Sequence, residues 1–320
     1  MKRTSAPDNA QLSILAALAF VLFASPTNAQ KAISYRGICD ASAAVPLDQD
    51  HFVVADDEHN TLQIYRRDLP DPVSAVPVWQ FLGTDEDKES DLEGSAVVGS
   101  RIYWISSHGT NKNGKVQERR RRFFATEIVG GRVPTVTPVG KPYGLLVDDL
   151  AKLPSLAKYR LADAAKLPPK SPGGLSIEGL ASTADGGLLV GFRNPVPGGK
   201  ALIVPLQNPG SVVQGSRASL GAPIEIDLQG QGIRSFERDG DSYLIVAGPI
   251  DGSGVSKLYR WSGRPADDPI LVAGIDFAGF NPEALFLVPN RSELQILSDD
   301  GKTDGEKCSE KKFRSMIVAK

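Results

Sequence analysis

The amino-acid sequence predicts an all-β fold, a β-propeller of about five four-stranded blades, on two observations. Helical periodicity is almost absent, while 32 glycines and 23 prolines separate many short apolar runs, which is the pattern of a sandwich, a barrel or a propeller. A unit of two strands, opened by a charged residue, also recurs at intervals of roughly 50 residues, a period typical of propeller blades. The repeat therefore favours the propeller.

Each copy of the repeat is an apolar strand opened by a charged residue, then a turn and a second strand. The opening residues of the five copies are Asp40, Glu93, Glu178, Arg234 and Glu283. Two further strands, at 123–128 and 133–139, complete the blade that begins at Glu93. The last copy has only three strands, so we expect the strand at 33–36 to complete it and close the ring.

The interval between Glu93 and Glu178 is longer than the others. Residues 144–170 account for the difference, because their leucines recur among Lys, Asp and Ala in a helical pattern. We therefore predict a helical insertion near 144–170. Six blades stay open as an alternative, should the insertion contain another sheet.

The N-terminus has the parts of a secretory signal: a basic start at Lys2, an apolar run at 12–23, and small residues that end at Ala29. We expect cleavage of residues 1–29, which leaves residues 30–320 as a single propeller domain. The apolar run is shorter than the roughly 20 residues of a membrane-spanning helix. The sequence thus predicts a periplasmic or secreted protein with no membrane span after cleavage.

The chain has two cysteines, Cys39 and Cys308. In a propeller, both are expected on the face where the inner strands begin, near the seam of the ring. An isolated pair in an exported protein is a disulfide candidate. We predict a Cys39–Cys308 bond, with two unpaired thiols as the alternative.

The formal net charge is −2. Nucleic-acid-binding domains usually carry a clear basic excess, so the composition argues against a nucleic-acid partner. The partner we expect is a small ligand, and the oligomeric state stays open.

Three motifs carry a family resemblance: Asp-Leu-Glu-Gly at 91–94, Ile-Glu-Gly-Leu at 177–180 and Gly-Ile-Arg-Ser-Phe-Glu at 232–237. With these motifs the chain resembles an uncharacterised bacterial family, the domain of unknown function 3616. The resemblance implies an exported β-propeller and no established activity. A more distant likeness is to the phytase-like and esterase-like propellers, and function does not follow from such a likeness of fold.

Four of the opening residues are acids and are expected to converge at one mouth of the central channel. Like charges in a partly dry site either take up protons or bind a cation. Oxygen ligands without Cys or a His cluster suit Ca²⁺ or Mg²⁺. The sequence therefore predicts a metal site whose ligands are Asp40, Glu93, Glu178 and Glu283. The alternative is that these acids only bind backbone amides of neighbouring strands or turns.

A small anionic ligand is the expected partner of this mouth. Arg234 lies at an opening position, and Arg193 and Asn194 end the second strand of the third blade, so we expect these three to contact the ligand. His108 is the candidate catalytic base, or else a loop residue. The four arginines at 119–122 either belong to a solvent-exposed loop or draw an anionic ligand to the mouth.

Two functions follow from this arrangement: a metal-assisted hydrolase of a phosphoester or ester, and a noncatalytic propeller module that binds a ligand or a protein. The sequence contains no nucleophile elbow, phosphate-binding glycine loop or zinc motif. Whether the protein is an enzyme therefore stays open.

Overall fold

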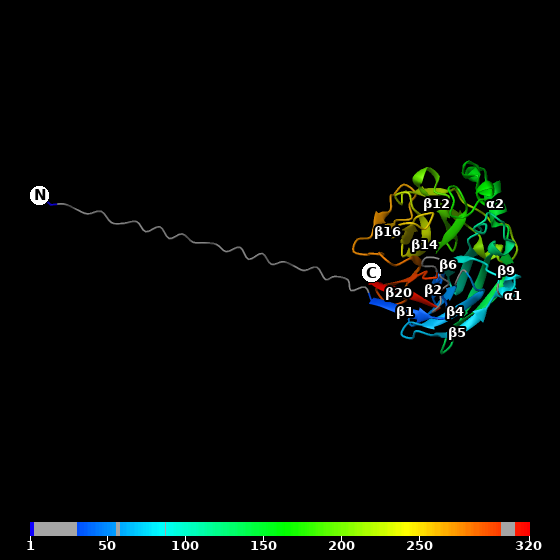
Figure 1. Cartoon of the computed structure of the whole chain (residues 1–320), viewed down its shortest axis with the longest axis horizontal. Helices are drawn as coiled ribbons and strands as arrows, with labels where there is room; N and C mark the ends of the chain where they lie inside the picture. Colours follow the sequence, from blue (N-terminus) through cyan, green and yellow to red (C-terminus); the bar gives the residue numbers. More distant parts are fainter. Residues whose placement is uncertain (3–30, 56–57, 87, 302–310) are drawn as a thin grey trace.

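The structure, a computed structural model, describes residues 1–2, 31–55, 58–86, 88–301 and 311–320 (Figure 1). Within these residues, twenty strands form five four-stranded antiparallel sheets. The innermost strand of each sheet contacts the innermost strands of the next sheet and the previous one. The fold is a five-bladed β-propeller, so the predicted fold class is confirmed.

Each of the first four blades uses four consecutive strands, ordered from the central channel outwards. Blade one contains β2 (Ala43–Pro46), β3 (His51–Ala55), β4 (Thr61–Arg66) and β5 (Pro72–Pro77). Blade two contains β6 (Leu92–Val98), β7 (Arg101–Ser106), β8 (Phe123–Val129) and β9 (Thr135–Tyr143). Blade three contains β10 (Ser176–Ser182), β11 (Leu188–Asn194), β12 (Ala201–Leu206) and β13 (Ile224–Ile226). Blade four contains β14 (Gly232–Asp239), β15 (Ser242–Gly248), β16 (Lys257–Trp261) and β17 (Ile270–Leu271).

Blade five joins the two ends of the chain, as the sequence predicted. It contains β18 (Pro282–Leu287), β19 (Glu293–Ser298) and β20 (Lys312–Ala319), and β1 (Lys31–Arg36) is its outer strand. β1 pairs antiparallel with β20 from Lys31 opposite Ile317 to Arg36 opposite Lys312. The ring is therefore closed by hydrogen bonds between residues far apart in sequence.

Short helices lie between the strands. The α-helices are α1 (Trp79–Leu82), α2 (Leu146–Lys152), α3 (Leu161–Ala164) and α4 (Pro209–Val212). The 3₁₀ helices are η1 (Glu118–Arg120), η2 (Pro154–Tyr159) and η3 (Pro197–Gly199). The elements between residues 144 and 170 are α2, η2 and α3, which confirms the helical insertion and leaves no sixth sheet there.

The hydrophobic core is divided among the gaps between neighbouring blades. Five clusters of buried apolar side chains each join two adjacent sheets. The leucines of the helical insertion, such as Leu146 and Leu150, belong to the cluster between blades two and three. The aromatic rings of Tyr35, Phe52 and Phe313 fill the gap between blades five and one. The apolar faces of the inner strands are thus covered by the neighbouring blades.

Two predictions concern residues outside the described ranges. The predicted signal peptide, residues 1–29, lies outside the described ranges from residue 3 onwards, and so does the disulfide partner Cys308, so both stay predictions. Cys39 itself is described, is 8% exposed, and lies at the seam, where its carbonyl accepts a hydrogen bond from the Asp300 amide at 3.1 Å. Helices of the described ranges are all too short or too polar to cross a membrane.

Candidate functional site

The charged residues at the starts of the inner strands lie at irregularities of the strand pairing. Glu93, Glu178, Arg234 and Glu283 each fall at a register shift between the first and second strand of a blade. A bulge of this kind leaves one residue unpaired and redirects its side chain. The sequence pattern of a charged residue followed by a small one thus marks the bulge. The four side chains meet at one end of the central channel, here called the channel mouth.

Blade one departs from this pattern. Asp40 forms an isolated bridge with Asp299, and a Cβ atom at Gly301 would collide with the Asp40 carboxylate. The Asp40 side chain therefore lies against the 299–301 turn of blade five. Ser42 directly precedes the first paired residue of β2, and its hydroxyl contacts Glu283 Oε2 at 3.4 Å. Blade one thus contributes a hydroxyl group where the repeat led us to expect an acid.

Two arginines neutralise part of the acid cluster. Arg193 Nη1 donates to Glu178 Oε1 at 2.9 Å, and Arg234 forms a direct ion pair with Glu283. Arg234 Nε lies 3.7 Å from Glu178 Oε2, and its Nη1 donates to Asn281 Oδ1 at 2.7 Å. All four charged side chains of these pairs are less than one-tenth exposed. Ion pairs this buried depend on each other, because removing one partner leaves an unpaired charge in the interior.

The surroundings shift the pKa values of both arginines. Burial, with the nearby Arg193 charge, lowers the pKa of Arg234 to about 10. Burial also opposes the charge of Arg193, but the Glu178 carboxylate outweighs it, and the pKa of Arg193 is raised. Both guanidinium groups are therefore positively charged at neutral pH.

A cavity of about 10 Å³ lies just inside the channel mouth. Among the described residues, its charged lining consists of Glu93 and Glu178, and its hydroxyl groups come from Ser42, Ser95 and Ser235. Oε2 of Glu178 is buried and accepts no hydrogen bond from the described part of the chain. A volume of this size holds about one water molecule. The cavity therefore combines the dimensions of a single ion with an acidic, oxygen-rich lining.

The predicted four-carboxylate metal site is not assembled in this form. Within the ranges that the structure describes, no three His, Cys, Asp or Glu side chains form a group that could hold a metal ion. Two of the predicted ligands, Glu93 and Glu178, line the cavity, whereas Glu283 contacts Arg234 and Asp40 contacts the 299–301 turn. The predicted ligand residues Arg193 and Arg234 are at the mouth, but they bind its acids.

His108 and Asn194 face the interior between blades two and three. His108 is completely buried, and its Nδ1 lies 2.8 Å from the Ser106 carbonyl oxygen. Burial lowers the pKa of His108 to about 4, so the ring is neutral at physiological pH. Asn194 Nδ2 donates to the carbonyl groups of Pro169 and Ser171, both at 2.7 Å. Asn194 thus anchors the end of the insertion segment, and a catalytic role of His108 stays a prediction.

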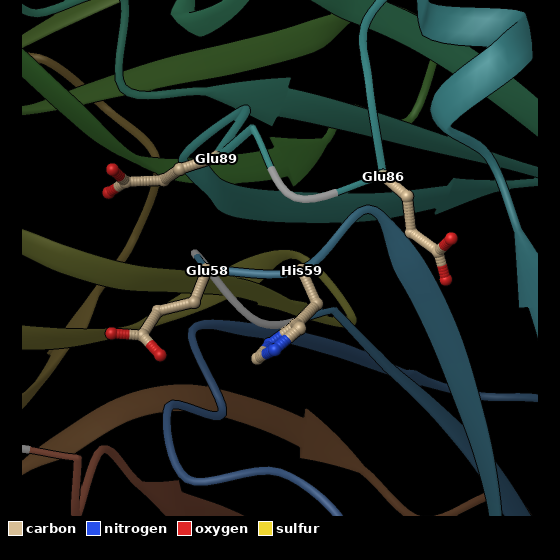
Figure 2. Close-up of a pocket in the computed structure, with 4 residues that line it drawn as sticks. All are labelled: Glu58, His59, Glu86 and Glu89. Carbon is tan, nitrogen blue, oxygen red and sulfur yellow. The ribbon is translucent and has the colours of Figure 1, made fainter. Parts of the chain in front are cut away.

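A wider pocket of about 620 Å³ opens on the same face. It lies where the loop after β3, the second strand of blade one, meets the segment that precedes β6, the first strand of blade two. It is lined by Glu58, His59, Glu86 and Glu89. In Figure 2 the carboxylates of Glu58 and Glu89 point to the same side, whereas that of Glu86 points away from them. The sequence analysis had not singled out Glu86 or Glu89, because they belong to an irregular loop outside the repeat. This pocket makes the face around the channel mouth more acidic.

The arginine run 119–122 is held by local contacts. Arg120 forms an ion pair with Asp91 at 3.0 Å and a second one with Glu89. Arg122 Nε donates to the Leu82 carbonyl at 2.9 Å. Burial, partly offset by Arg120, raises the pKa of Asp91 to about 7. Arg119 Nε donates to the Glu89 carbonyl at 2.9 Å. Three of the four arginines therefore join the loop between β7 and β8 to the segment that precedes β6.

Glu237, further along β14, gives the fold a pH dependence. Burial raises the pKa of its carboxyl from 4.5 to about 8, so the folded state holds its proton more tightly than the unfolded state does. The carboxyl has no effect on stability below about pH 4.5, where both states are protonated. The protein loses stability as the pH rises from about 4.5 to about 8, and the loss is complete above that pH. We expect Glu237→Gln to match the wild type near pH 4 but to be more stable than the wild type by on the order of 2 kcal/mol at about pH 9. Urea unfolding at both pH values measures this, and an equal difference at the two pH values would refute it.

Comparisons with known proteins found a family match and similar solved structures. Residues 141–273 match the family model described as protein of unknown function (DUF3616). A search of curated proteins found no match. Glutaminyl cyclase from Myxococcus xanthus is similar in structure at 13% identity and a TM-score of 0.46, over 91% of this chain and 98% of that one.

A second solved structure is the PQQ-bound aldose sugar dehydrogenase from Streptomyces coelicolor. It is 11% identical with a TM-score of 0.44, over 92% of this chain and 100% of that one. Neither likeness bears on activity. The resemblance inferred from the sequence is confirmed, since the stretch from the end of blade two through blade four matches DUF3616.

Proposed function

We propose that the protein is a ligand-binding propeller whose channel mouth takes up one hard cation, Ca²⁺ or Mg²⁺, between Glu93 and Glu178. The observation that carries the proposal is the lining of the small cavity. Two carboxylates and three serine hydroxyls line it, whereas both arginines of the network are directed at carboxylates. Oxygen ligands of this kind are those that Ca²⁺ and Mg²⁺ prefer.

Charge balance supports the same proposal. The network contains three glutamates, Glu93, Glu178 and Glu283, and the two arginines Arg193 and Arg234. These five side chains together carry a formal charge of −1. The buried Glu178 Oε2 lacks a hydrogen bond within the described ranges, and such an atom is costly unless a cation, a donor or a water molecule meets it. A cation in the cavity would satisfy this oxygen and reduce the excess charge.

The chemistry that follows is binding. A cation at the mouth would present its outward coordination positions to an anionic group of a ligand, which is how the expected small anionic ligand would be held. Hydrolysis would also need a base that reaches the ligand, and His108 is completely buried. The geometry therefore supports a noncatalytic binding module better than a metal-assisted hydrolase.

Calorimetric titration with CaCl₂ and with MgCl₂ tests the proposal. We expect one cation to bind per chain, and Glu93→Gln to weaken the binding at least about tenfold, because it removes one of two charged ligands. Glu93 suits the test because it is partly exposed, so its replacement should not unfold the chain. Glu127→Gln is the matched control, since Glu127 on β8 pairs with Arg101 on β7, away from the channel mouth.

Two results would contradict the proposal. One is the absence of binding by either cation at millimolar concentration. The other is equal affinity in the Glu93→Gln variant, the control and the wild type. In both cases the acids of the mouth would serve only to join the blades.

A further inference from the structure

The second cavity of ligand size lies at the opposite end of the ring, at the seam between blades one and five. Its volume is about 910 Å³, within the range of small-molecule sites. Three strand ends border it: the end of β4 at Arg66, the start of β19 at Glu293 and the end of β20 at Ala319. These strand ends are remote from the bulges at the channel mouth. This cavity, here called the seam pocket, is thus independent of the proposed cation site.

A buried arginine belongs to the lining of the seam pocket. The Arg67 side chain is only 9% exposed. Its Nε donates to Gln295 Oε1 and its Nη2 donates to Glu293 Oε2, both at 2.9 Å. Its Nη1 has no hydrogen-bond partner among the described residues. The guanidinium is therefore fixed in place, with part of its donor capacity unused.

Arg66 and Arg291 add two exposed guanidinium groups at the rim. Arg66 is paired with Asp68, and both side chains are more than two-fifths exposed. Arg291 Nη2 lies 3.2 Å from Asp50, and its Nη1 lies 3.9 Å from Glu293. Exposed single contacts of the Arg291 kind are worth little, so Arg291 can turn towards a bound anion at small cost. Arg66 is held by two hydrogen bonds to the Asp68 carboxylate and stays at the rim.

The formal charges that line the pocket balance, but burial makes the electrostatic potential near Arg67 positive. Three arginines and three acids line it. Asp50 and Asp68 are more than three-fifths exposed, so water and salt screen their charges, whereas Arg67 is screened much less. The remaining acid, Glu293, is shared between Arg67 and Arg291. An anionic group is thus favoured near Arg67.

The other wall of the seam pocket is apolar. Ile33 of β1 and the β20 residues Ile317 and Ala319 form it. Ile33 and Ile317 are partly exposed, and Ala319 is exposed. A ligand with an apolar body would cover this surface and gain the free energy of burying it.

We propose that the seam pocket binds a carboxylate carried on a short apolar group. The planar carboxylate matches the paired donors of an arginine, and the apolar group lies on the β1–β20 wall. Arg291 contacts the anion, and the positive charge of Arg67 lies beneath it. The ligand bridges blades one and five, so its binding also strengthens the closure of the ring.

Titration of the full chain with hexanoate, acetate and hexylamine, followed by calorimetry, tests the proposal. Hexanoate is expected to bind at least about tenfold more tightly than acetate because of its additional methylene groups. Hexylamine, which has the same apolar body with the opposite charge, is expected not to bind. Arg291→Gln should weaken hexanoate binding at least about tenfold, while Arg264→Gln, in a similar exposed pair with Asp267, should leave it unchanged.

A second variant tests the apolar wall. Ile317→Thr keeps a β-branched residue in β20, and it should reduce the preference for hexanoate over acetate while acetate binding stays the same. The proposal is wrong if hexanoate binds no better than acetate, if hexylamine binds equally well, or if Arg291→Gln behaves like Arg264→Gln. None of these outcomes depends on Ca²⁺ or Mg²⁺, so the seam pocket and the channel mouth are tested separately.

Discussion

Arg234→Met is expected to lower the free energy of unfolding by about 3–5 kcal/mol, because it leaves buried carboxylates without their counter-charge. Arg234 joins blades three, four and five through Glu178, Asn281 and Glu283. Its side chain passes Gly248, where a Cβ atom would lie 2.4 Å from the arginine Cδ. The methionine side chain should fit the same space, so the loss of stability reports the removal of the positive charge. Urea denaturation of both proteins measures the difference.

Two further variants make this result specific. Arg264→Met removes an exposed arginine that pairs with Asp267 and should cost less than about 1 kcal/mol. Adding Glu283→Gln to Arg234→Met should restore part of the lost stability, because one of the unpaired carboxylates becomes neutral. If Arg234→Met lowered the free energy of unfolding no more than Arg264→Met does, the buried ion-pair network would not stabilise the fold.

Deletion of β1, residues 31–36, is expected to abolish cooperative unfolding or to lower the melting temperature by far more than any single substitution. β1 supplies the outer strand of blade five, and Tyr35 is fully buried. The Tyr35 ring lies 5.1 Å from that of Phe52 and 5.3 Å from that of Phe313. Losing one large buried aromatic side chain already costs about 3–5 kcal/mol, a large share of a typical domain stability of about 5–15 kcal/mol.

Circular dichroism melting curves measure this effect, with Tyr35→Phe as the control. That variant keeps the ring and loses the hydroxyl, which donates to the Arg67 carbonyl at 2.9 Å and accepts a longer hydrogen bond from Gln295 Nε2 at 3.4 Å. It should cost about 1 kcal/mol. An unchanged melting temperature after deletion of β1 would mean that the ring does not need this strand.

The blade repeat could be predicted from the sequence because it depends on local patterns. Short apolar runs separated by glycine and proline define strands, and a charged residue before a small one recurs where each inner strand begins. The missing strand of the last blade followed from counting, and β1 fills that place. The helical insertion was readable for the same reason, since the spacing of Leu146 and Leu150 is that of a helix face.

The chemistry at the channel mouth was less predictable because it depends on register and on contacts between blades. Sequence spacing placed Asp40 in line with Glu93, but a bridge to Asp299 turns it away and leaves Ser42 at the mouth. The pairing of Arg193 with Glu178 joins the second strand of blade three to its own first strand. No local sequence pattern predicts such a pair. The expectation that four acids bind a metal therefore did not include it.

The most direct test of the proposed cation site is anomalous diffraction from crystals of the protein grown with Mn²⁺, a hard cation that takes oxygen ligands. We expect one strong peak in the cavity at the channel mouth, within bonding distance of the Glu93 and Glu178 carboxylates, and its loss in crystals of Glu93→Gln. A cavity without a peak in the wild-type crystals, or a peak only in the pocket around Glu58 and Glu89, would contradict the proposal.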